Sequence, residues 1–302
     1  MNNLSNLTII IVTFLTNKKT LLNCLKSIDK RVKVVIVENS QKFKNKNFFI
    51  SKFKNIKIFC TGKNLGYGGG NNFGLKRVKT SNVLILNPDS ILDKYFFKNL
   101  NFILNNKSFS LIGCDLINNK GFATGGYFNL KKNNFFKKNF SLIKRDNFTK
   151  VDWVTGNSML LNLRNLRSKK LFDENFFLYF EEFDLCKQLK RKNKEVYLCK
   201  NLKVHHLGFK SSHINKSNFK LESEKLRNWH WMWSYFYYHK KNYNYFYALF
   251  KTSDKLLKSV LKTILFSMIF NKKEKNKYYY RSLGLVSSML GVKSYYRGKF
   301  FN

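Results

Sequence analysis

The first half of the chain alternates runs of apolar residues with segments whose apolar residues recur at helical spacing. Four runs have the length of strands and are bounded by polar residues: LTIIIVTF (7–14), VKVVIVEN (32–39), IKIFC (56–60) and NVLILN (82–87). Residues 17–28 and 69–78 lie between such runs and are predicted to be helices. Because unbroken apolar runs are typical of parallel strands buried on both faces, the pattern predicts an α/β fold with a doubly wound sheet.

Polar residues gather where these predicted strands end. Ligands of doubly wound sheets bind beyond the carboxyl ends of the strands. Four features stand at such ends: Thr13, Glu38, the loop 62–72 and Asp89. Asp89 follows Pro88, the only proline of the chain. Asp89 can hold a divalent cation against a diphosphate, or it can be a turn or helix-cap residue.

The second half is less regular and then becomes helical. Short strands are predicted within residues 110–160, with a hairpin or loop at 118–129. A helix is predicted from about residue 181, because acids at its start and lysines at its end suit the helix dipole. We therefore predict a first domain over residues 1–214 and a helical, basic and aromatic region over residues 215–302.

The C-terminal region contains one segment with two distinct sides. In residues 254–270 the apolar residues recur at helical spacing, and Lys255, Lys258 and Lys262 share the other side. Such a basic amphipathic helix fits an anionic membrane surface, or it packs on its own domain. Residues 227–247 are rich in aromatic residues and fit a membrane-interface belt, an acceptor platform or a packed helix.

The charge of the chain is strongly positive. It has 57 Lys and Arg against 17 Asp and Glu, a formal charge of +40. A polyanionic partner would explain this excess, and so would an AT-rich genome that favours lysine codons. Only nine of the basic residues are Arg, whereas Arg makes the bidentate contacts of specific nucleic-acid readout. The alternative to an enzyme is a basic protein that binds nucleic acid or an anionic surface. No specific nucleic-acid partner is expected.

Cysteine usage and hydropathy indicate a cytoplasmic protein. The five cysteines are scattered, odd in number and without a CxxC pair, so they are expected to be reduced packing residues. The N-terminus lacks the pattern of a signal peptide, and no apolar run is long enough to span a membrane.

Three further motifs have both a structural and a functional interpretation. TGKNLGYGGGNNFGL (61–75) is neither a P-loop nor a GxGxxG motif, but a glycine-rich turn that opens a helix can bind phosphate through its N–H groups. FFLYFEEFDLC (176–186) contains clustered acids that are either helix-start residues or a general base. VHHLG (204–208) contains two histidines that are either structural or a metal ligand.

In their order along the chain, these motifs resemble the family 2 inverting glycosyltransferases of the GT-A fold. The resemblance covers about residues 7–212 and is greatest to the bacterial rhamnosyltransferase-like and galactofuranosyltransferase-like branch. The motifs that carry it are IIIVTF, VVIVENS, NLGYGGGNNFGL, LILNPDSIL, WVTGNSMLL, LFDENFFLYFEEFDLC and VHHLG. It implies a Rossmann-like, mixed and mostly parallel sheet with a helical C-terminal extension.

The resemblance also implies a role for particular residues. The residues implied to bind the nucleotide sugar are Thr13, Glu38, Asn64, Gly66, Gly70, Asn72 and Asp89. Asp89 and His206 would bind Mg²⁺ or Mn²⁺, with His205 a weaker candidate. Glu182, which stands where the family has Asp, would be the general base with Glu181 beside it. Trp153, Thr155 and Gly156 would line the acceptor and sugar pocket.

The implied function is metal-dependent, inverting transfer of a sugar in cell-surface or cell-wall polysaccharide synthesis. Rhamnose from a dTDP donor is the first expectation, followed by galactofuranose or a UDP-hexose. The acceptor would be a glycan or a polyprenyl-linked saccharide, and the protein would lie peripherally on the inner face of the cytoplasmic membrane. Because Glu182 replaces the usual Asp, a degenerate transferase that binds nucleotide sugar without turnover is a further alternative.

Overall fold

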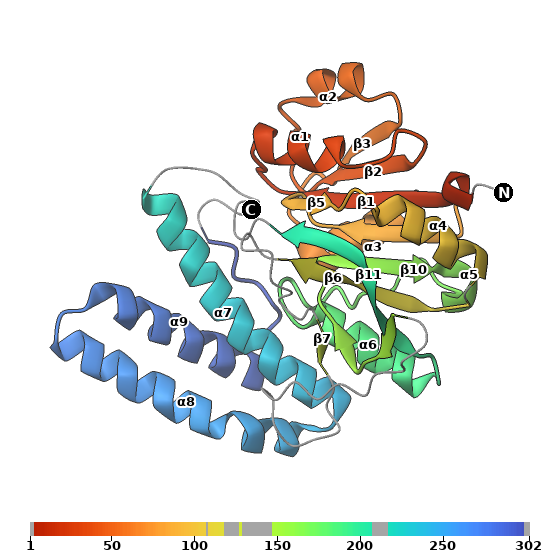
Figure 1. Ribbon diagram of the computed structural model, residues 1–302. Coiled ribbons are helices and arrows are strands. Elements are labelled where there is room, and N and C mark those ends of the chain that lie inside the picture. The colour runs from red at the N-terminus through yellow and green to blue at the C-terminus, as the bar shows by residue number, and fades with distance from the viewer. Residues whose placement is uncertain (1–2, 107, 118–126, 129–146, 207–216, 299–302) are drawn as a thin grey trace. The chain divides into compact units, whose positions relative to one another are not determined.

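The computed structural model describes residues 3–106, 108–117, 127–128, 147–206 and 217–298 (Figure 1). The chain divides into two compact units. We call Met1–Leu65, Gly69–Phe172 and Leu185–His213 the sheet unit, and Gly66–Gly68, Asp173–Asp184 and Ile214–Asn302 the helical unit. The predicted boundary at residue 214 falls where the last segment of the helical unit begins, but this unit also contains two short segments from earlier in the chain.

Within the described residues, the sheet unit is built on a mixed sheet of nine strands. Their order is β3-β2-β1-β4-β10-β6-β11-β5, with β8 paired to β11. The strands are β1 (Leu7–Thr13), β2 (Lys33–Glu38), β3 (Ile56–Cys60), β4 (Asn82–Leu86), β5 (Ser90–Leu92), β6 (Leu111–Ile117), β8 (Phe148–Lys150), β10 (Ser158–Asn162) and β11 (Val196–His206). The four strands predicted from apolar runs are the parallel neighbours β3, β2, β1 and β4. Residues 118–129, predicted as a hairpin or loop, lie outside the described residues except for β7 (Tyr127–Phe128), which pairs with β9 (Trp153–Val154).

The sheet must curl, because a short connection joins strands that are distant in its order. Residues 87–89 are the whole link between β4 and β5, yet β10, β6 and β11 lie between these two strands in the sheet. Strands in a flat sheet are about 4.8 Å apart, so four steps exceed the reach of three residues. The curl brings Asp89, at the end of this link, beside β11.

Helices cover the sheet and fix the position of the glycine-rich segment. The helices of this part of the chain are α1 (Lys18–Lys26), α2 (Lys46–Lys52), α3 (Gly66–Leu75), α4 (Phe96–Asn106), α5 (Leu163–Leu166) and α6 (Glu181–Arg191), with a short 3₁₀ helix at Asn3–Asn6. A Cβ on Gly70 would lie 2.7 Å from Val12 Cγ1, and one on Gly74 would lie 2.8 Å from Ile10 Cγ2. These glycines let α3 lie close against β1.

The helical unit consists mainly of α7 (Ser217–Asn242), α8 (Tyr245–Met268) and α9 (Lys272–Met289). Met232, Phe236, Ala248 and Leu285 form its buried apolar cluster. A Cβ on Gly284 would lie only 2.2 Å from the backbone oxygen of Trp229, so α9 approaches α7 closely at this point. Of the helices in the described ranges, none combines the length and hydropathy needed to cross a membrane.

Candidate active site

Thr13 and Glu38 end two neighbouring strands and are direct partners in the parallel register of β1 and β2. Both are buried. Thr13 Oγ1 donates a hydrogen bond to Glu38 Oε2 at 2.7 Å, and Ser40 Oγ donates one to Oε1 at 2.7 Å. Burial raises the pKa of Glu38, and these hydrogen bonds only partly oppose the rise. The sheet thus holds a fixed carboxyl group at the edge where the nucleotide is predicted to bind.

Asn64, predicted to bind the nucleotide sugar, is linked to this pair by a hydrogen bond from Asn39. The sequence motifs did not single out Asn39. Asn39 Nδ2 donates to Asn64 Oδ1 at 3.1 Å, and the N–H of Leu65 donates to Asn39 Oδ1 at 3.1 Å. Asn39 is buried and directly follows Glu38. It therefore ties the start of the glycine-rich loop to the end of β2.

Other predicted residues of the glycine-rich segment have packing contacts. Gly66 has φ +77°, and a Cβ there would lie 2.2 Å from Phe177 O within the helical unit. Asn72 is buried in the sheet unit, where its Nδ2 donates to Phe172 O at 2.8 Å and its Oδ1 accepts from Leu171 N at 3.0 Å. Packing accounts for the residue types at these positions and for Gly70, and their contact with a nucleotide stays a prediction.

Asp89 and His206, predicted as metal ligands, lie together in the sheet unit. His206 is the last residue of β11, and Ser90 is its partner in the antiparallel register with β5. The distance from Asp89 Oδ2 to His206 Nε2 is 3.4 Å. Asp89 is only 3% exposed, and its Oδ1 atom has no hydrogen-bond partner among the described residues.

The neighbouring histidine has a different partner. His205 Nε2 lies 3.6 Å from Asp93 Oδ2, because adjacent residues of a strand point to opposite faces. His206, rather than His205, therefore pairs with Asp89. Gly208, which belongs to the same motif, lies outside the described residues.

A divalent cation fits this pair on chemical grounds. A buried carboxylate oxygen without a partner is costly unless a cation or donor satisfies it, and His nitrogen is a suitable second ligand. Within the described ranges, no group of three or more His, Cys, Asp or Glu residues is placed to bind a metal. Further ligands would therefore have to come from water and from a bound diphosphate.

The residues predicted to line the acceptor pocket are connected along the chain to Asn157, which contacts the same edge of the sheet. Thr155 and Gly156 link Trp153, in β9, to this asparagine. The N–H of Asn87 donates to Asn157 O at 2.9 Å, and Ser90 Oγ donates to Asn157 Oδ1 at 3.0 Å. Asn157 therefore contacts residues on both sides of Asp89 in the chain. In the sequence, only its position within the TGNS motif pointed to this residue.

Glu181 and Glu182 begin helix α6 within the helical unit. Glu181 is 3% exposed, and Glu182 is partly buried. Burial raises the pKa of both carboxyl groups, that of Glu182 to about 7. The two preceding residues, Tyr179 and Phe180, have φ 70°, a left-handed conformation that is unusual for aromatic residues.

Charged contacts from α7 hold the segment that contains these glutamates. Lys241 Nζ lies 2.7 Å from Asp173 Oδ2 and 2.7 Å from Asp184 Oδ2. Asp184 is fully buried and also accepts from Asn242 Nδ2 at 3.0 Å. Burial acts to raise the pKa of Asp173, but the hydrogen bonds and charge of Lys241 outweigh it and lower that pKa. Asp184, one of the clustered acids of the 176–186 motif, is therefore held by an ion pair and a hydrogen bond from α7.

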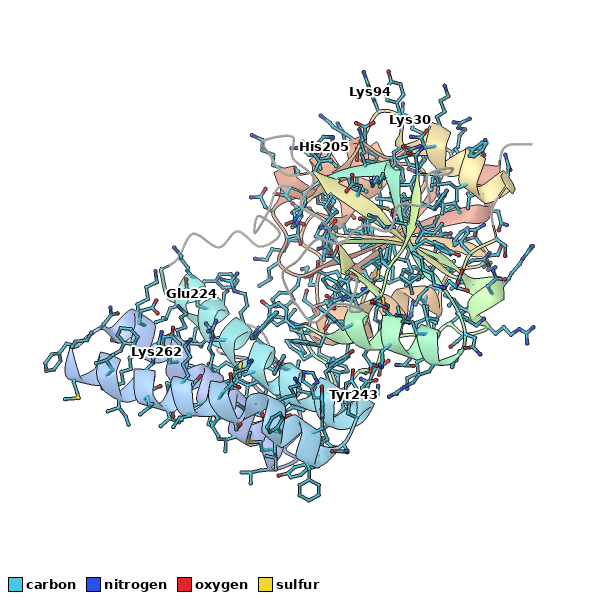
Figure 2. The ribbon with its side chains drawn as sticks, turned by 60° about the horizontal axis from the view of Figure 1, so that its bottom comes forward. Lys30, Lys94, His205, Glu224, Tyr243 and Lys262 are labelled. Atoms are coloured by element: carbon cyan, nitrogen blue, oxygen red, sulfur yellow. The ribbon has the colours of Figure 1, made fainter. Side chains whose placement is uncertain are left out.

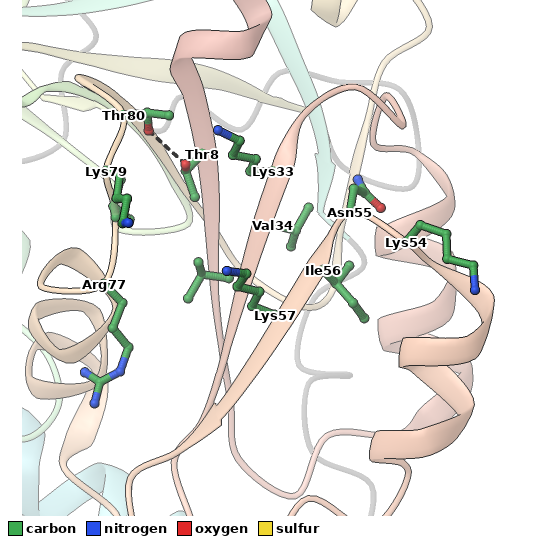
Figure 3. Close-up of a pocket in the computed structure, with 12 residues that line it drawn as sticks. Thr8, Lys33, Val34, Lys54, Asn55, Ile56, Lys57, Arg77, Lys79 and Thr80 are labelled. Atoms are coloured by element: carbon green, nitrogen blue, oxygen red, sulfur yellow. Dashed lines mark hydrogen bonds between the residues drawn. The ribbon is translucent and has the colours of Figure 1, made fainter.

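A pocket of about 290 Å³ lies at the other ends of the strands (Figure 3). It is next to Thr8, Lys33 and Ile56, near the starts of β1, β2 and β3. Its basic lining residues are Lys33, Lys54, Lys57, Arg77 and Lys79. No predicted site residue lines it, so this pocket is separate from the edge that holds Asp89.

The predicted site residues thus form two groups. Thr13, Glu38, Asp89 and His206 gather in the sheet unit at the carboxyl ends of its strands. Glu181 and Glu182 belong to the helical unit and are fixed there. The sheet unit has the chemistry to bind an anionic ligand with a cation, and the helical unit has a carboxyl group suited to accept a proton near neutral pH.

The chain is similar to known proteins in sequence and in fold. Residues 8–161 match the family described as Glycosyl transferase family 2. The curated "Low-salt glycan biosynthesis hexosyltransferase Agl10" of Haloferax volcanii is 26% identical over 203 residues, which cover 65% of this chain and 65% of Agl10. The match thus spans slightly less than two thirds of that relative.

Similar solved structures include residues 1–349 of S. aureus TarS in complex with UDP. The TM-score is 0.52 at 12% identity, over 94% of this chain and 91% of that chain. GalNAc-T7 with UDP, GalNAc and Mn²⁺ gives a TM-score of 0.50 at 11% identity, over 67% of this chain and 43% of that chain. At these identities the likeness shows a shared fold, and it confirms the predicted GT-A type α/β fold with a helical C-terminal region.

Proposed function

Because the chain belongs to glycosyl transferase family 2, we propose that it transfers a hexose from a nucleoside-diphosphate sugar to a hydroxyl group of a glycan. Membership of this family agrees with the glycosyltransferase enzyme that the motifs predict. The observation that carries the proposal is the pairing of buried Asp89 with His206. The pair lies at the edge of the sheet where β1 ends at Thr13 and β2 ends at Glu38. A diphosphate with its cation would bind at this edge.

Glu182 is the proposed general base. It would accept the proton of the acceptor hydroxyl while that oxygen attacks the anomeric carbon and the bond to the diphosphate breaks. Attack from the face opposite the leaving group inverts the anomeric configuration, so one carboxylate is enough. Its raised pKa of about 7 suits this role, because a base is most effective when its pKa is near the working pH.

Asp89 and His206 would hold Mg²⁺ or Mn²⁺. When bound, the cation offsets the negative charge of the leaving diphosphate. The GalNAc-T7 structure contains Mn²⁺, which supports this choice of metal. Thr13 and Glu38 would orient the nucleotide, and Thr155, Gly156 and Trp153 would lie by the sugar and acceptor.

The donor and acceptor are proposed from the motifs and the relatives together. Structures of TarS contain UDP or UDP-GlcNAc, and Agl10 is named a hexosyltransferase. These names favour a UDP-hexose, whereas the rhamnosyltransferase-like motifs favour dTDP-rhamnose. The acceptor would be a saccharide, free or polyprenyl-linked, in cell-surface polysaccharide synthesis. A peripheral location at the inner face of the cytoplasmic membrane remains part of the proposal.

A donor panel tests this function. Purified protein is incubated with UDP- and dTDP-hexoses and saccharide acceptors, with Mn²⁺ or with EDTA, and free nucleotide and glycosylated product are measured. We expect product with at least one donor, only in the presence of metal, and none for Glu182→Gln. Donor binding without product in the wild type would indicate a degenerate transferase. Normal product formation by Glu182→Gln would refute the role of that residue.

A further inference from the structure

Helix α8 turns its small and polar residues toward its neighbours in the helical unit. Ala248, Thr252 and Ser259 are its buried residues. Lys262 Nζ, on the next turn, donates a hydrogen bond to Tyr278 Oη of α9 at 3.1 Å. This side of the helix packs on α7 and α9, where Leu249 and Leu256 are partly buried and Phe266 stacks on Tyr278.

The opposite side of α8 is apolar and exposed. Phe246 is 79% exposed and Met268 is 72% exposed, and the residues between them at helical spacing are also more than half exposed. The apolar face, as we call it, consists of Phe246, Phe250, Leu257, Leu261, Ile264 and Met268. The sequence left open whether this helix packs its apolar side on its own domain, and the structure shows that side exposed. An apolar surface of this extent normally marks an interaction site.

Lysines follow one flank of the apolar face. Lys251, Lys255 and Lys258 are spaced by four and three residues, so they form one row along the helix, and Lys262 follows them at the edge that faces α9. Asp254 is the only acidic residue of α8. Figure 2 shows the side chains of this unit, with Lys262 labelled. The helix thus presents an apolar stripe beside a row of positive charge.

We propose that the apolar face of α8 docks on the surface of a bilayer that contains anionic lipids. Its apolar side chains would enter the boundary between headgroups and acyl chains, and the lysine row would contact the headgroups. A second copy of the chain is a poorer partner, because two chains of formal charge +40 repel each other, whereas an anionic surface attracts both.

Vesicle flotation tests the docking. The full-length protein is mixed with vesicles of phosphatidylcholine alone or with phosphatidylglycerol, at an ionic strength of about 0.15 M and of about 1 M. The apolar variant is Phe250→Ser, Leu257→Ser and Leu261→Ser together. The lysine variant is Lys251→Gln, Lys255→Gln and Lys258→Gln. Its matched control replaces three exposed lysines of the sheet unit by Gln, namely Lys98 and the two labelled in Figure 2, Lys30 and Lys94.

We expect the wild type to float with phosphatidylglycerol vesicles and much less with phosphatidylcholine. The lysine variant should bind roughly ten- to a hundredfold more weakly at the lower salt, and the control variant less than threefold. High salt screens the charges, so any vesicle binding that the wild type keeps at the higher salt should come from the apolar face. The apolar variant should lose that binding. Melting temperatures should not fall, because the replaced side chains are mostly exposed.

Three results would overturn the docking. One is no binding of the wild type to anionic vesicles, and another is equal binding of the wild type and the apolar variant. The third is a wild-type dimer in sedimentation that the apolar variant converts to a monomer, since the face would then join two copies. Vesicle binding and sugar transfer are separate measurements, so vesicle binding without transfer would refute only the proposed function.

Discussion

Replacing Lys241 by Met should destabilise the helical unit. Lys241 is the cation that contacts both Asp173 and Asp184, each at 2.7 Å. Asp184 is fully buried, and the replacement would remove the positive charge that lies 2.7 Å from its Oδ2. Met has a similar length and apolar stem, so the replacement removes the charge and leaves most of the packing.

The expected cost follows from the burial of the two partners. Breaking a buried ion pair by removing one partner costs about 3–5 kcal/mol, because the other charge stays buried. The Lys241 side chain is 28% exposed, so solvent screens part of the interaction. We therefore expect the free energy of unfolding to fall by about 2–4 kcal/mol, a large part of the total stability of a typical domain.

Urea denaturation followed by circular dichroism measures this cost. The matched control is Lys240→Met, at the neighbouring exposed lysine, which should lower the unfolding free energy by less than about 1 kcal/mol. The double variant Lys241→Met with Asp184→Asn should cost less than the sum of its single changes, because the two residues interact. Equal costs for Lys241→Met and Lys240→Met would refute the reasoning.

Three further changes have defined outcomes. Glu182→Gln should raise the unfolding free energy by about 1–3 kcal/mol at about pH 8, because the fold raises the pKa of this carboxyl from 4.5 to about 7 and so disfavours its ionised form. The gain in unfolding free energy should shrink as the pH falls from about 7 toward 4.5, because the wild-type carboxyl then becomes protonated. Urea titrations at several pH values measure this dependence, and an equal gain at every pH would contradict the prediction. Gly284→Ala should lower the melting temperature sharply, because a Cβ would lie 2.2 Å from Trp229 O, and an unchanged thermal melt would contradict this contact. Thr13→Val should weaken nucleotide binding and cost about 1–3 kcal/mol of stability, since it removes a donor to buried Glu38; calorimetry of UDP binding and a thermal melt check both.

The sequence predicted the fold best where a run of apolar residues forms a strand that is buried on both faces. The four apolar runs became parallel neighbours, because strands covered on both faces need apolar residues at nearly every position. The ends of those strands then placed Thr13, Glu38 and Asp89 at one edge. The resemblance implied His206 rather than His205 as the metal ligand, and the structure places His206, not His205, beside Asp89.

Contacts between residues distant in sequence were not predictable from such patterns. The strand β5 is only three residues long and directly follows Asp89, so its apolar pattern is too short to detect. The link between Asp184 and Lys241 depends on a contact between α6 and α7, and no local signal encodes it. Periodicity also detected the two sides of α8, but only the structure showed that the apolar side is exposed.

The most direct test of the proposed site compares two aspartates of the sheet unit. Each lies near one of the adjacent histidines: Asp89 is 3.4 Å from His206, and Asp93 is 3.6 Å from His205. Metal-dependent release of nucleotide from the best donor is measured for Asp89→Asn and Asp93→Asn. We predict that Asp89→Asn lowers the rate by about a hundredfold or more, while Asp93→Asn stays within about threefold of wild type. Equal rates for the two variants, or full activity of Asp89→Asn in EDTA, would contradict the proposed site.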